Sequence, residues 1–222
     1  MRRAHLCGRP WRRHHHRRRP RPDRIHGRGA AAVSEPWPFG DLRLGGYDLI
    51  LADMPSEYET YSDAGQSKSP QSHYHCMPLT EIAALDVGRL AAPNCWLLHW
   101  ATAPNLPDAL YVMRAWGFIY KTRVNWTKVY PSGAPAMGCG YIARSQDETL
   151  LIGSIGKPWY AAPFVSPFLG VRREHSRKPE ELYPLIDAFA PRARRCELFA
   201  RTRRPGWDYA LSDELDKFGA GA

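Results

Sequence analysis

The chain has 222 residues, of which 44% are apolar and 12% aromatic, and it carries a formal charge of +9. This length supports one domain with a full hydrophobic core, and the absence of an apolar run of about 20 residues excludes a membrane-spanning helix. Of the 31 basic residues, 11 are arginines within residues 1–32, where Asp23 is the only acid; the rest of the chain has 20 basic and 21 acidic residues. A nucleic-acid-binding surface on the folded part must therefore come from the arrangement of charges, not from an excess of them.

Residues 1–32 are expected to form a disordered tail, because they are rich in Arg, His and Pro and nearly devoid of aliphatic residues. They contain no apolar core of signal-peptide length. Two interpretations of the tail stay open. It is either a polybasic arm that raises affinity for phosphate backbones, or sequence upstream of a true start at Val33. Residues 33–216 are predicted to form the domain, and residues 217–222 a flexible C-terminus.

The five cysteines are scattered without paired spacing, which favours a reducing, cytoplasmic environment. His73, His75 and Cys76 form one short cluster of potential metal ligands. A structural zinc site needs four ligands at recurrent spacing, and the sequence holds no second cluster, so we expect no metal site.

The first predicted strand runs from Tyr47 to Ala52 and stops at Asp53, which is followed by Met54 and Pro55. Such a strand delivers the Asp53 carboxylate to the carboxyl edge of a sheet, where open α/β sheets bind their ligands. The polar residues 56–78 that follow are expected to form a long loop opening from this edge.

Further elements follow in alternation. Helices are predicted over residues 79–85, with Thr80 as a candidate cap, over 106–116, closed by Gly117, and over 178–189, with Pro179 in the first turn. Strands are predicted over residues 95–100, 118–126, 148–152 and 196–200, and a second long loop over 130–146, with Gly153 punctuating the third of these strands. The alternation predicts an α/β fold with a mostly parallel sheet and helices on both faces.

Several segments, in this order, resemble the adenine-N6 methyltransferases related to the catalytic subunit of the mRNA adenosine methylase, in particular the bacterial and phage members. The resemblance spans residues 47–216 and rests, besides the first strand, on His73-Tyr74-x-x-Met77, Trp116-Gly117-Phe118, Met137-Gly138-x-Gly140-Tyr141, Arg173-Glu174-His175-Ser176-Arg177-Lys178-Pro179-Glu180, Glu197-Leu198-Phe199-Ala200-Arg201 and Pro205-Gly206-Trp207-Asp208. It implies a Rossmann-like, S-adenosylmethionine-dependent methyltransferase sheet in which the catalytic strand precedes the cofactor-binding strand. It also implies methyl transfer to the N6 amine of adenine in nucleic acid, with DNA favoured over RNA.

The resemblance assigns the catalytic role to Asp53, Met54, Pro55 and Ser56, which stand where the family has Asp-Pro-Pro-Trp. In the family, the carboxylate and a following main-chain carbonyl accept hydrogens from the target amine, which directs the nitrogen lone pair toward the sulfonium methyl group. Asp53 and Pro55 match this motif, and Met54 retains a carbonyl. Ser56 replaces the tryptophan that stacks on the flipped base, and one such stack is typically worth about 1–3 kcal/mol.

The resemblance also implies binding roles. Cofactor-binding candidates are Lys178, Arg201, Asp213 and Glu214, of which the last two replace an amide-containing segment of the family. Substrate-binding candidates are Tyr58, Tyr61 and Tyr74, which could stack on bases in place of the missing tryptophan, Glu148, expected near the adenine, and Arg173 and Arg177, which could contact phosphates. A run of charges such as 172–178 is also compatible with a simple solvated surface.

The departures at Met54 and Ser56 leave a second interpretation open, namely a catalytically degenerate relative that binds nucleic acid or a protein partner. A homodimer or a partner subunit is also compatible with the sequence, whereas no membrane partner is expected.

Overall fold

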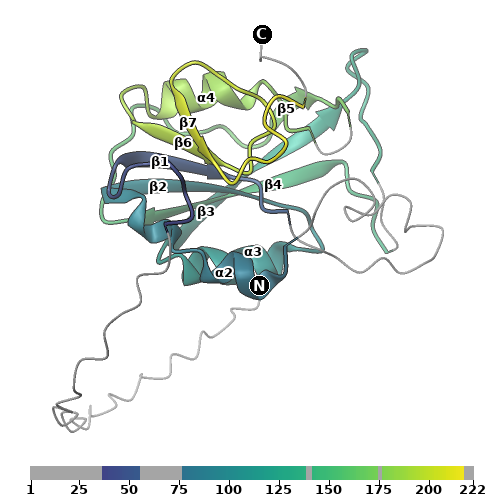
Figure 1. The fold of residues 1–222 in the computed structure, drawn as a ribbon. Helices are drawn as coiled ribbons and strands as arrows, with labels where there is room; N and C mark the ends of the chain where they lie inside the picture. Colours follow the sequence, from purple (N-terminus) through teal and green to yellow (C-terminus); the bar gives the residue numbers. More distant parts are fainter. Residues whose placement is uncertain (1–36, 56–76, 139–141, 175–176, 218–222) are drawn as a thin grey trace, which may run out of the picture. The chain divides into compact units, whose positions relative to one another are not determined.

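The structure is a computed structural model that describes residues 37–55, 77–138, 142–174 and 177–217. Within these residues the chain forms a seven-stranded sheet with the order β5-β3-β4-β2-β1-β6-β7 (Figure 1). The strands are β1 Tyr47–Ala52, β2 Ala91–Ala101, β3 Ile119–Val129, β4 Asp147–Ile155, β5 Phe168–Val171, β6 Arg195–Leu198 and β7 Trp207–Ala210. The helices are α2 Leu79–Ala84, the 3-10 helix η2 Val87–Arg89, α3 Leu106–Ala115 and α4 Leu182–Phe189.

The sheet is mostly parallel, as the sequence predicts. β1 pairs in parallel with both β2 and β6, β6 with β7, and β3 with β5. Only β4 runs against its neighbours, β2 and β3. Consequently β4 begins at the edge where the other described strands end. The strand that delivers Asp53 lies directly beside β6, which comes near the end of the chain, and this arrangement agrees with the order that the family resemblance implies.

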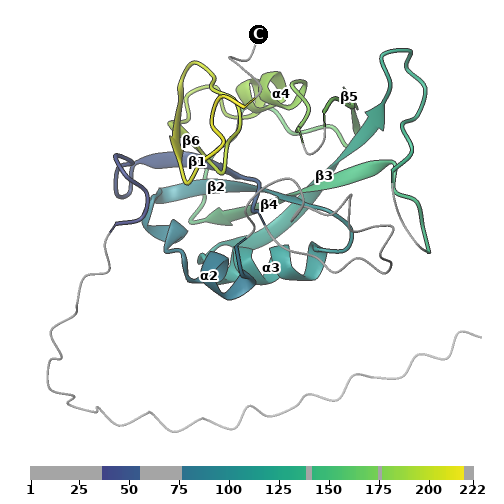
Figure 2. The same ribbon diagram turned by 45° about the vertical axis from the view of Figure 1, so that its right-hand side comes forward.

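Helices cover both faces of the sheet, which confirms the α/β expectation. Figures 1 and 2 show α2 and α3 on one face and α4 on the other. Along β1, Ile50 and Ala52 belong to the core that includes residues of α2 and α3, whereas Leu49 and Leu51 belong to the core that includes residues of α4. This is the two-residue alternation that a strand buried on both faces must show.

Gly153 does not punctuate the strand, as the sequence analysis expected, but lies inside β4 opposite Leu97. A Cβ atom at this position would approach Met113 Sδ to 2.8 Å. The glycine therefore lets α3 pack closely against the sheet, which is the usual reason for a glycine in a buried strand.

Two further details differ from expectation. Thr80 does not cap α2; it lies inside the helix, which follows Pro78 and has no side-chain cap. α4 begins at Leu182 and not at residue 178, because residues 180–181 form a turn in which the Leu182 amide donates to the Pro179 carbonyl at 3.3 Å. The sequence analysis did not predict the short strands β5 and β7, because each has only four residues, too few for a two-residue period to stand out.

None of the helices in the described ranges has the length and apolar character that crossing a membrane requires.

The buried histidine of β2 gives a testable property of the fold. His99 is fully buried and stacks on Trp116 with ring centroids 5.3 Å apart, and in the described structure neither ring nitrogen has a hydrogen-bond partner. Burial lowers the pKa of His99 to about 4, so the folded state resists protonation that the unfolded chain accepts near pH 6.5. Stability is therefore lost as the pH falls below about 6.5, by about 2 kcal/mol at pH 5.

We expect His99→Phe, which keeps the ring stack, to remove this acid-dependent loss. Urea unfolding at pH 8 and pH 5 measures it: the free energy of unfolding of the variant should change less between the two pH values than that of the natural chain, by about 2 kcal/mol. An identical pH dependence in both proteins would contradict the assignment.

Candidate active site

Three elements bring charged side chains together at the carboxyl edge of the sheet. Asp53 follows β1, Glu148 lies at the start of the reversed strand β4, and Lys178 precedes α4. The Lys178 ammonium lies 3.0 Å from Asp53 Oδ1 and 3.3 Å from Glu148 Oε2. Because β4 runs against its neighbours, Glu148 at the start of β4 lies at the same edge of the sheet as Asp53 at the end of β1.

Lys178 is a buried cation shared by two carboxylates. Burial opposes its charge, but the Asp53 and Glu148 carboxylates outweigh that effect and raise the pKa of Lys178 above its usual value. Burial likewise works to raise the pKa of Glu148, yet Lys178 and Lys128 lower it below its usual value. Both groups are therefore ionised at neutral pH, and among the residues that the structure describes Lys178 contacts Asp53 through Oδ1.

Lys128, at the end of β3, extends this cluster and was not among the sequence candidates. Its ammonium lies 2.5 Å from Glu148 Oε1 and 5.0 Å from the centre of the Trp126 ring. On the same side Lys178 lies 5.6 Å from the centre of the Trp100 ring. Lys128 follows an apolar strand position by two residues, at the carboxyl edge of the sheet, and this place in the sequence is the signal that could have identified it. The neighbouring side chains thus form a row of alternating charge: Lys128, Glu148, Lys178 and Asp53.

The segment after Asp53 is anchored on both sides. Met54 is 7% exposed and belongs to the core below α2 and α3, and the Pro55 carbonyl accepts a hydrogen bond of 2.9 Å from the Met77 amide. Ser56, Tyr58, Tyr61 and Tyr74 lie outside the described residues, as do the potential metal ligands at positions 73, 75 and 76. Their roles stay predictions.

Of the expected cofactor residues, Lys178 precedes α4, whereas Arg201, Asp213 and Glu214 lie on the loops after β6 and β7. Arg201 Nε lies 3.2 Å from Glu214 Oε2, so the structure brings two of the four candidates into contact, whereas Asp213 is exposed on the neighbouring turn. Between β6 and Arg201 the chain passes through Phe199 at φ 63°, a conformation that costs energy in a bulky residue and typically marks a functional loop.

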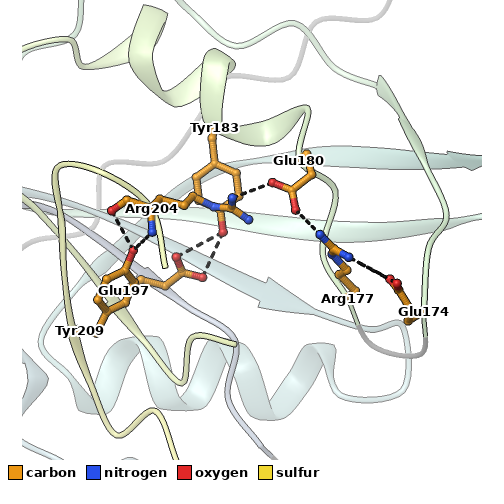
Figure 3. Close-up of polar contacts among 7 residues, drawn as sticks. All are labelled: Glu174, Arg177, Glu180, Tyr183, Glu197, Arg204 and Tyr209. Carbon is orange, nitrogen blue, oxygen red and sulfur yellow. Dashed lines mark hydrogen bonds and ion pairs between the residues drawn. The ribbon is translucent and has the colours of Figure 1, made fainter. Parts of the chain in front are cut away.

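The two arginine candidates for phosphate contact differ in exposure. Arg173 is exposed, and its role as a phosphate contact stays a prediction. Arg177 has only 14% of its side chain exposed and pairs with Glu174 at 3.2 Å and with Glu180 at 3.1 Å (Figure 3). The charge run over residues 172–178 is therefore not simply a solvated surface, and Arg177 belongs to an internal network of ion pairs.

A small cavity joins these groups. It is lined by Asp53, Arg177, Lys178, Tyr183, Glu197, Phe199, Arg201, Thr202 and Arg204. Sequence reasoning picked out four of these as site residues, namely Asp53, Arg177, Lys178 and Arg201, and the structure brings them together. Sequence reasoning did not assign roles to Glu197 or Arg204, although a glutamate inside the apolar strand predicted over residues 196–200 is itself a sign of a buried acid.

The chemistry of this lining suits the methionyl end of S-adenosylmethionine, which carries a carboxylate and an ammonium group. The lining offers both acidic and basic side chains, and some of their atoms, such as Arg204 Nε, are buried with no hydrogen-bond partner in the described structure. The cavity has a volume of about 30 Å³, which is much smaller than the methionyl end of S-adenosylmethionine. The long side chains around it must therefore move apart to admit that group.

Comparison with known proteins decides the family. Residues 47–210 match the family MT-A70, which covers more than half of the chain and all seven described strands. The chain belongs to the MT-A70 family. The resemblance to adenine-N6 methyltransferases is thereby confirmed, and with it the methyltransferase class of the enzyme and the Rossmann-like fold. Methyltransferases of this family generally depend on S-adenosylmethionine.

Relatives within this family carry related names. Over 78% of its length the chain is 30% identical to the type II methyltransferase M.MunI of a Mycoplasma species, and it covers 72% of that protein. It is 26% identical to a probable N6-adenosine-methyltransferase MT-A70-like protein of Oryza sativa subsp. japonica and 25% identical to the human N6-adenine-specific methyltransferase METTL4, again over 78% of the chain. The chain spans 24% of the rice protein and 38% of the human one.

The shared ammonium predicts a stability effect. We expect Lys178→Met to lower the free energy of unfolding at pH 7 by about 3 kcal/mol, because Asp53 and Glu148 would keep buried negative charge without this counter-ion. Below about pH 4 the difference should shrink, since the ion pairs contribute only while the carboxylates are ionised and Glu148 gains its proton as the pH falls through its lowered pKa.

Urea unfolding at pH 7 and pH 3.5 provides the measurement, with Lys157→Met, which removes an exposed lysine, as the matched control. The control should stay within about 0.5 kcal/mol of the natural chain. If Lys178→Met and Lys157→Met were equally stable at pH 7, the shared ion pair would contribute nothing.

Proposed function

We propose that this protein transfers a methyl group from S-adenosylmethionine to the N6 amine of adenine in nucleic acid, with DNA as the preferred polymer. The observation that carries the proposal is the contact between Lys178 and Asp53 at the end of β1, at the edge of the sheet where the family motif stands. The names of the relatives support the reaction, and the resemblance to bacterial and phage members favours DNA.

In this proposal the Asp53 carboxylate orients the substrate amine. Lys178 holds Oδ1 at 3.0 Å, which fixes the carboxylate in place, so that Oδ2 accepts one amine hydrogen. The Met54 main-chain carbonyl accepts the second. The nitrogen lone pair is then directed away from both acceptors and toward the methyl donor.

The reaction forms one carbon–nitrogen bond and breaks one carbon–sulfur bond, and the amine gives up one proton. S-adenosylmethionine supplies the methyl group on a sulfonium, which leaves as a thioether. The chain itself supplies position and electrostatics: an anionic acceptor beside the amine, fixed by a buried cation, in a partly desolvated site where such contacts are stronger than in water.

A direct assay tests the proposal. Methyl transfer from isotopically labelled S-adenosylmethionine should be measured on unmethylated genomic DNA, single-stranded DNA and RNA, followed by digestion to nucleosides. We expect labelled N6-methyladenine from the natural chain and a loss of at least about 100-fold in kcat with Asp53→Ala, because this variant removes the acceptor that orients the amine. Asp208→Asn, a change at an exposed aspartate on β7, is the matched control.

Equal activity of Asp53→Ala and the natural chain would exclude Asp53 from catalysis. No product on any of the three polymers, with intact folding by circular dichroism, would instead favour the degenerate, binding-only interpretation.

The altered motif gives a second prediction. Ser56→Trp would restore the aromatic side chain that the family stacks on the flipped base. We expect it to lower KM for nucleic acid by about 5- to 100-fold, which corresponds to one base-aromatic stack, while kcat changes much less. Steady-state kinetics on the preferred polymer separate the two constants. A rise in kcat with unchanged KM would mean that the missing tryptophan limits the chemical step and not the binding of the base.

A further inference from the structure

Lys128, near the end of β3, has no role in the reaction as proposed above, and it is not among the described residues that line the cavity beside Asp53. Its side chain is nevertheless only 19% exposed, and lysine is rarely buried without a partner. The partner is Glu148, whose Oε1 lies 2.5 Å from the Lys128 ammonium. Any effect of Lys128 on the reacting groups therefore passes through Glu148.

The position of the Lys128 ammonium is fixed from several sides. The main-chain amide of Lys128 donates to the Gln146 carbonyl and its carbonyl accepts from the Ala136 amide, both at 2.8 Å. The ammonium lies 5.0 Å from the centre of the Trp126 ring, and the ring nitrogen donates to the Gly170 carbonyl at 2.9 Å. A Cβ atom at position 170 would approach this nitrogen to 2.6 Å, so the glycine lets the ring lie under the cation.

The contacts along the row of charges are unequal. Glu148 lies 2.5 Å from Lys128 but 3.3 Å from Lys178. Lys178 in turn lies closer to Asp53, at 3.0 Å, than to Glu148. Each acid thus has its own near cation, Lys128 for Glu148 and Lys178 for Asp53, and the contact between Lys178 and Glu148 is the longest of the three.

This division depends on Lys128. The Glu148 side chain is 13% exposed and that of Asp53 is 22% exposed, so an ammonium is attracted more strongly by Glu148. The two lysines together lower the pKa of Glu148 in spite of its burial, so this acid is ionised and uses both positive charges. Without Lys128, the nearest cation of Glu148 in the described ranges is Lys178, which would be drawn toward the more buried acid and away from Asp53.

We propose that Lys128 is a positioning residue for the catalytic carboxylate. By neutralising Glu148, it leaves the Lys178 ammonium to Asp53, and this contact holds the carboxylate in the orientation that receives the target amine. Lys128 itself touches neither the amine nor the methyl donor. The inference rests on the proposed function, since it presumes that Asp53 orients the amine.

Steady-state kinetics of methyl transfer test the effect on the reaction. We expect Lys128→Met to lower kcat by about 10- to 100-fold, because a small misplacement of a reacting group is enough for such a loss, while KM for nucleic acid changes less than about threefold. Lys128→Arg keeps the positive charge and should retain most of the activity. Lys121→Met, which removes an exposed lysine from the same strand, is the matched control and should have the kcat of the natural chain.

A double-mutant cycle shows whether Lys128 acts through Glu148. In a Glu148→Gln background the acid has no charge to draw Lys178 away, so Lys128→Met should change kcat by less than about threefold, whatever Glu148→Gln does alone. An equal loss in both backgrounds, or a loss that lies in KM for nucleic acid, would show that Lys128 acts on the substrate directly and would overturn the proposal.

Crystal structures of the natural chain and of Lys128→Met give a readout that needs no activity. The distance from Lys178 Nζ to Asp53 Oδ1 should rise from 3.0 Å to beyond the limit of an ion pair, about 4 Å. Lys128→Gln, which keeps a hydrogen-bond donor but no charge, should show the same shift and takes the place of Lys128→Met if that variant does not fold.

The structural result separates the two proposals. An unchanged contact between Lys178 and Asp53 overturns the role of Lys128, whether or not the protein methylates nucleic acid. If the contact lengthens but the natural chain transfers no methyl group to any polymer, the proposed function fails, while the effect of Lys128 on Lys178 stands.

Discussion

The sharing of the Lys178 ammonium between Asp53 and Glu148 is the interaction on which the candidate site depends. A buried carboxylate costs several kcal/mol without a counter-ion, and here one cation serves two of them. The fold makes this possible in three separate ways. β1 ends at Asp53, the reversed direction of β4 places Glu148 at the same edge, and the late start of α4 leaves Lys178 in an irregular segment that can reach both. Residues far apart in sequence thus converge because strand direction, and not sequence distance, decides which side chains meet.

The same edge holds a second charged network built on different principles. Glu174, Arg177, Glu180 and Arg204 alternate in sign, from an exposed glutamate to an arginine that is largely buried, so each charge has a partner of opposite sign (Figure 3). The alternation stops at Glu197, which has a phenolic hydroxyl in place of a cation. Because Glu197 lines the cavity and burial raises its pKa to about 8, it has the character of a functional-site acid.

The sequence predicted much of this structure, and the parts that it missed have physical reasons. β1, β2, β3, β4, β6 and the three helices carry clear apolar periodicity, so pattern alone located them. β5 and β7 have four residues each, too short for a period to register. Gly153 was misread because a glycine signals a turn and a close packing contact equally well, and only the position of Met113 distinguishes them. Among the site residues, Asp53, Lys178, Glu148 and the Arg201–Glu214 pair came from the family motifs. Lys128 has a local signal in its place just after an apolar strand position, but Tyr183 and Arg204 have none, because their importance lies in which charges they contact, and contacts across a sheet are not encoded in local pattern.

Charge balance connects the two networks. Lys128, Glu148, Lys178 and Asp53 sum to zero, as do Glu174, Arg177, Glu180 and Arg204, so the site is balanced when Glu197 is protonated. The pKa of Glu197, which burial and the negative charges of Asp53 and Glu180 raise to about 8, agrees with this balance, because an ionised Glu197 would be an excess negative charge in a medium of low dielectric constant.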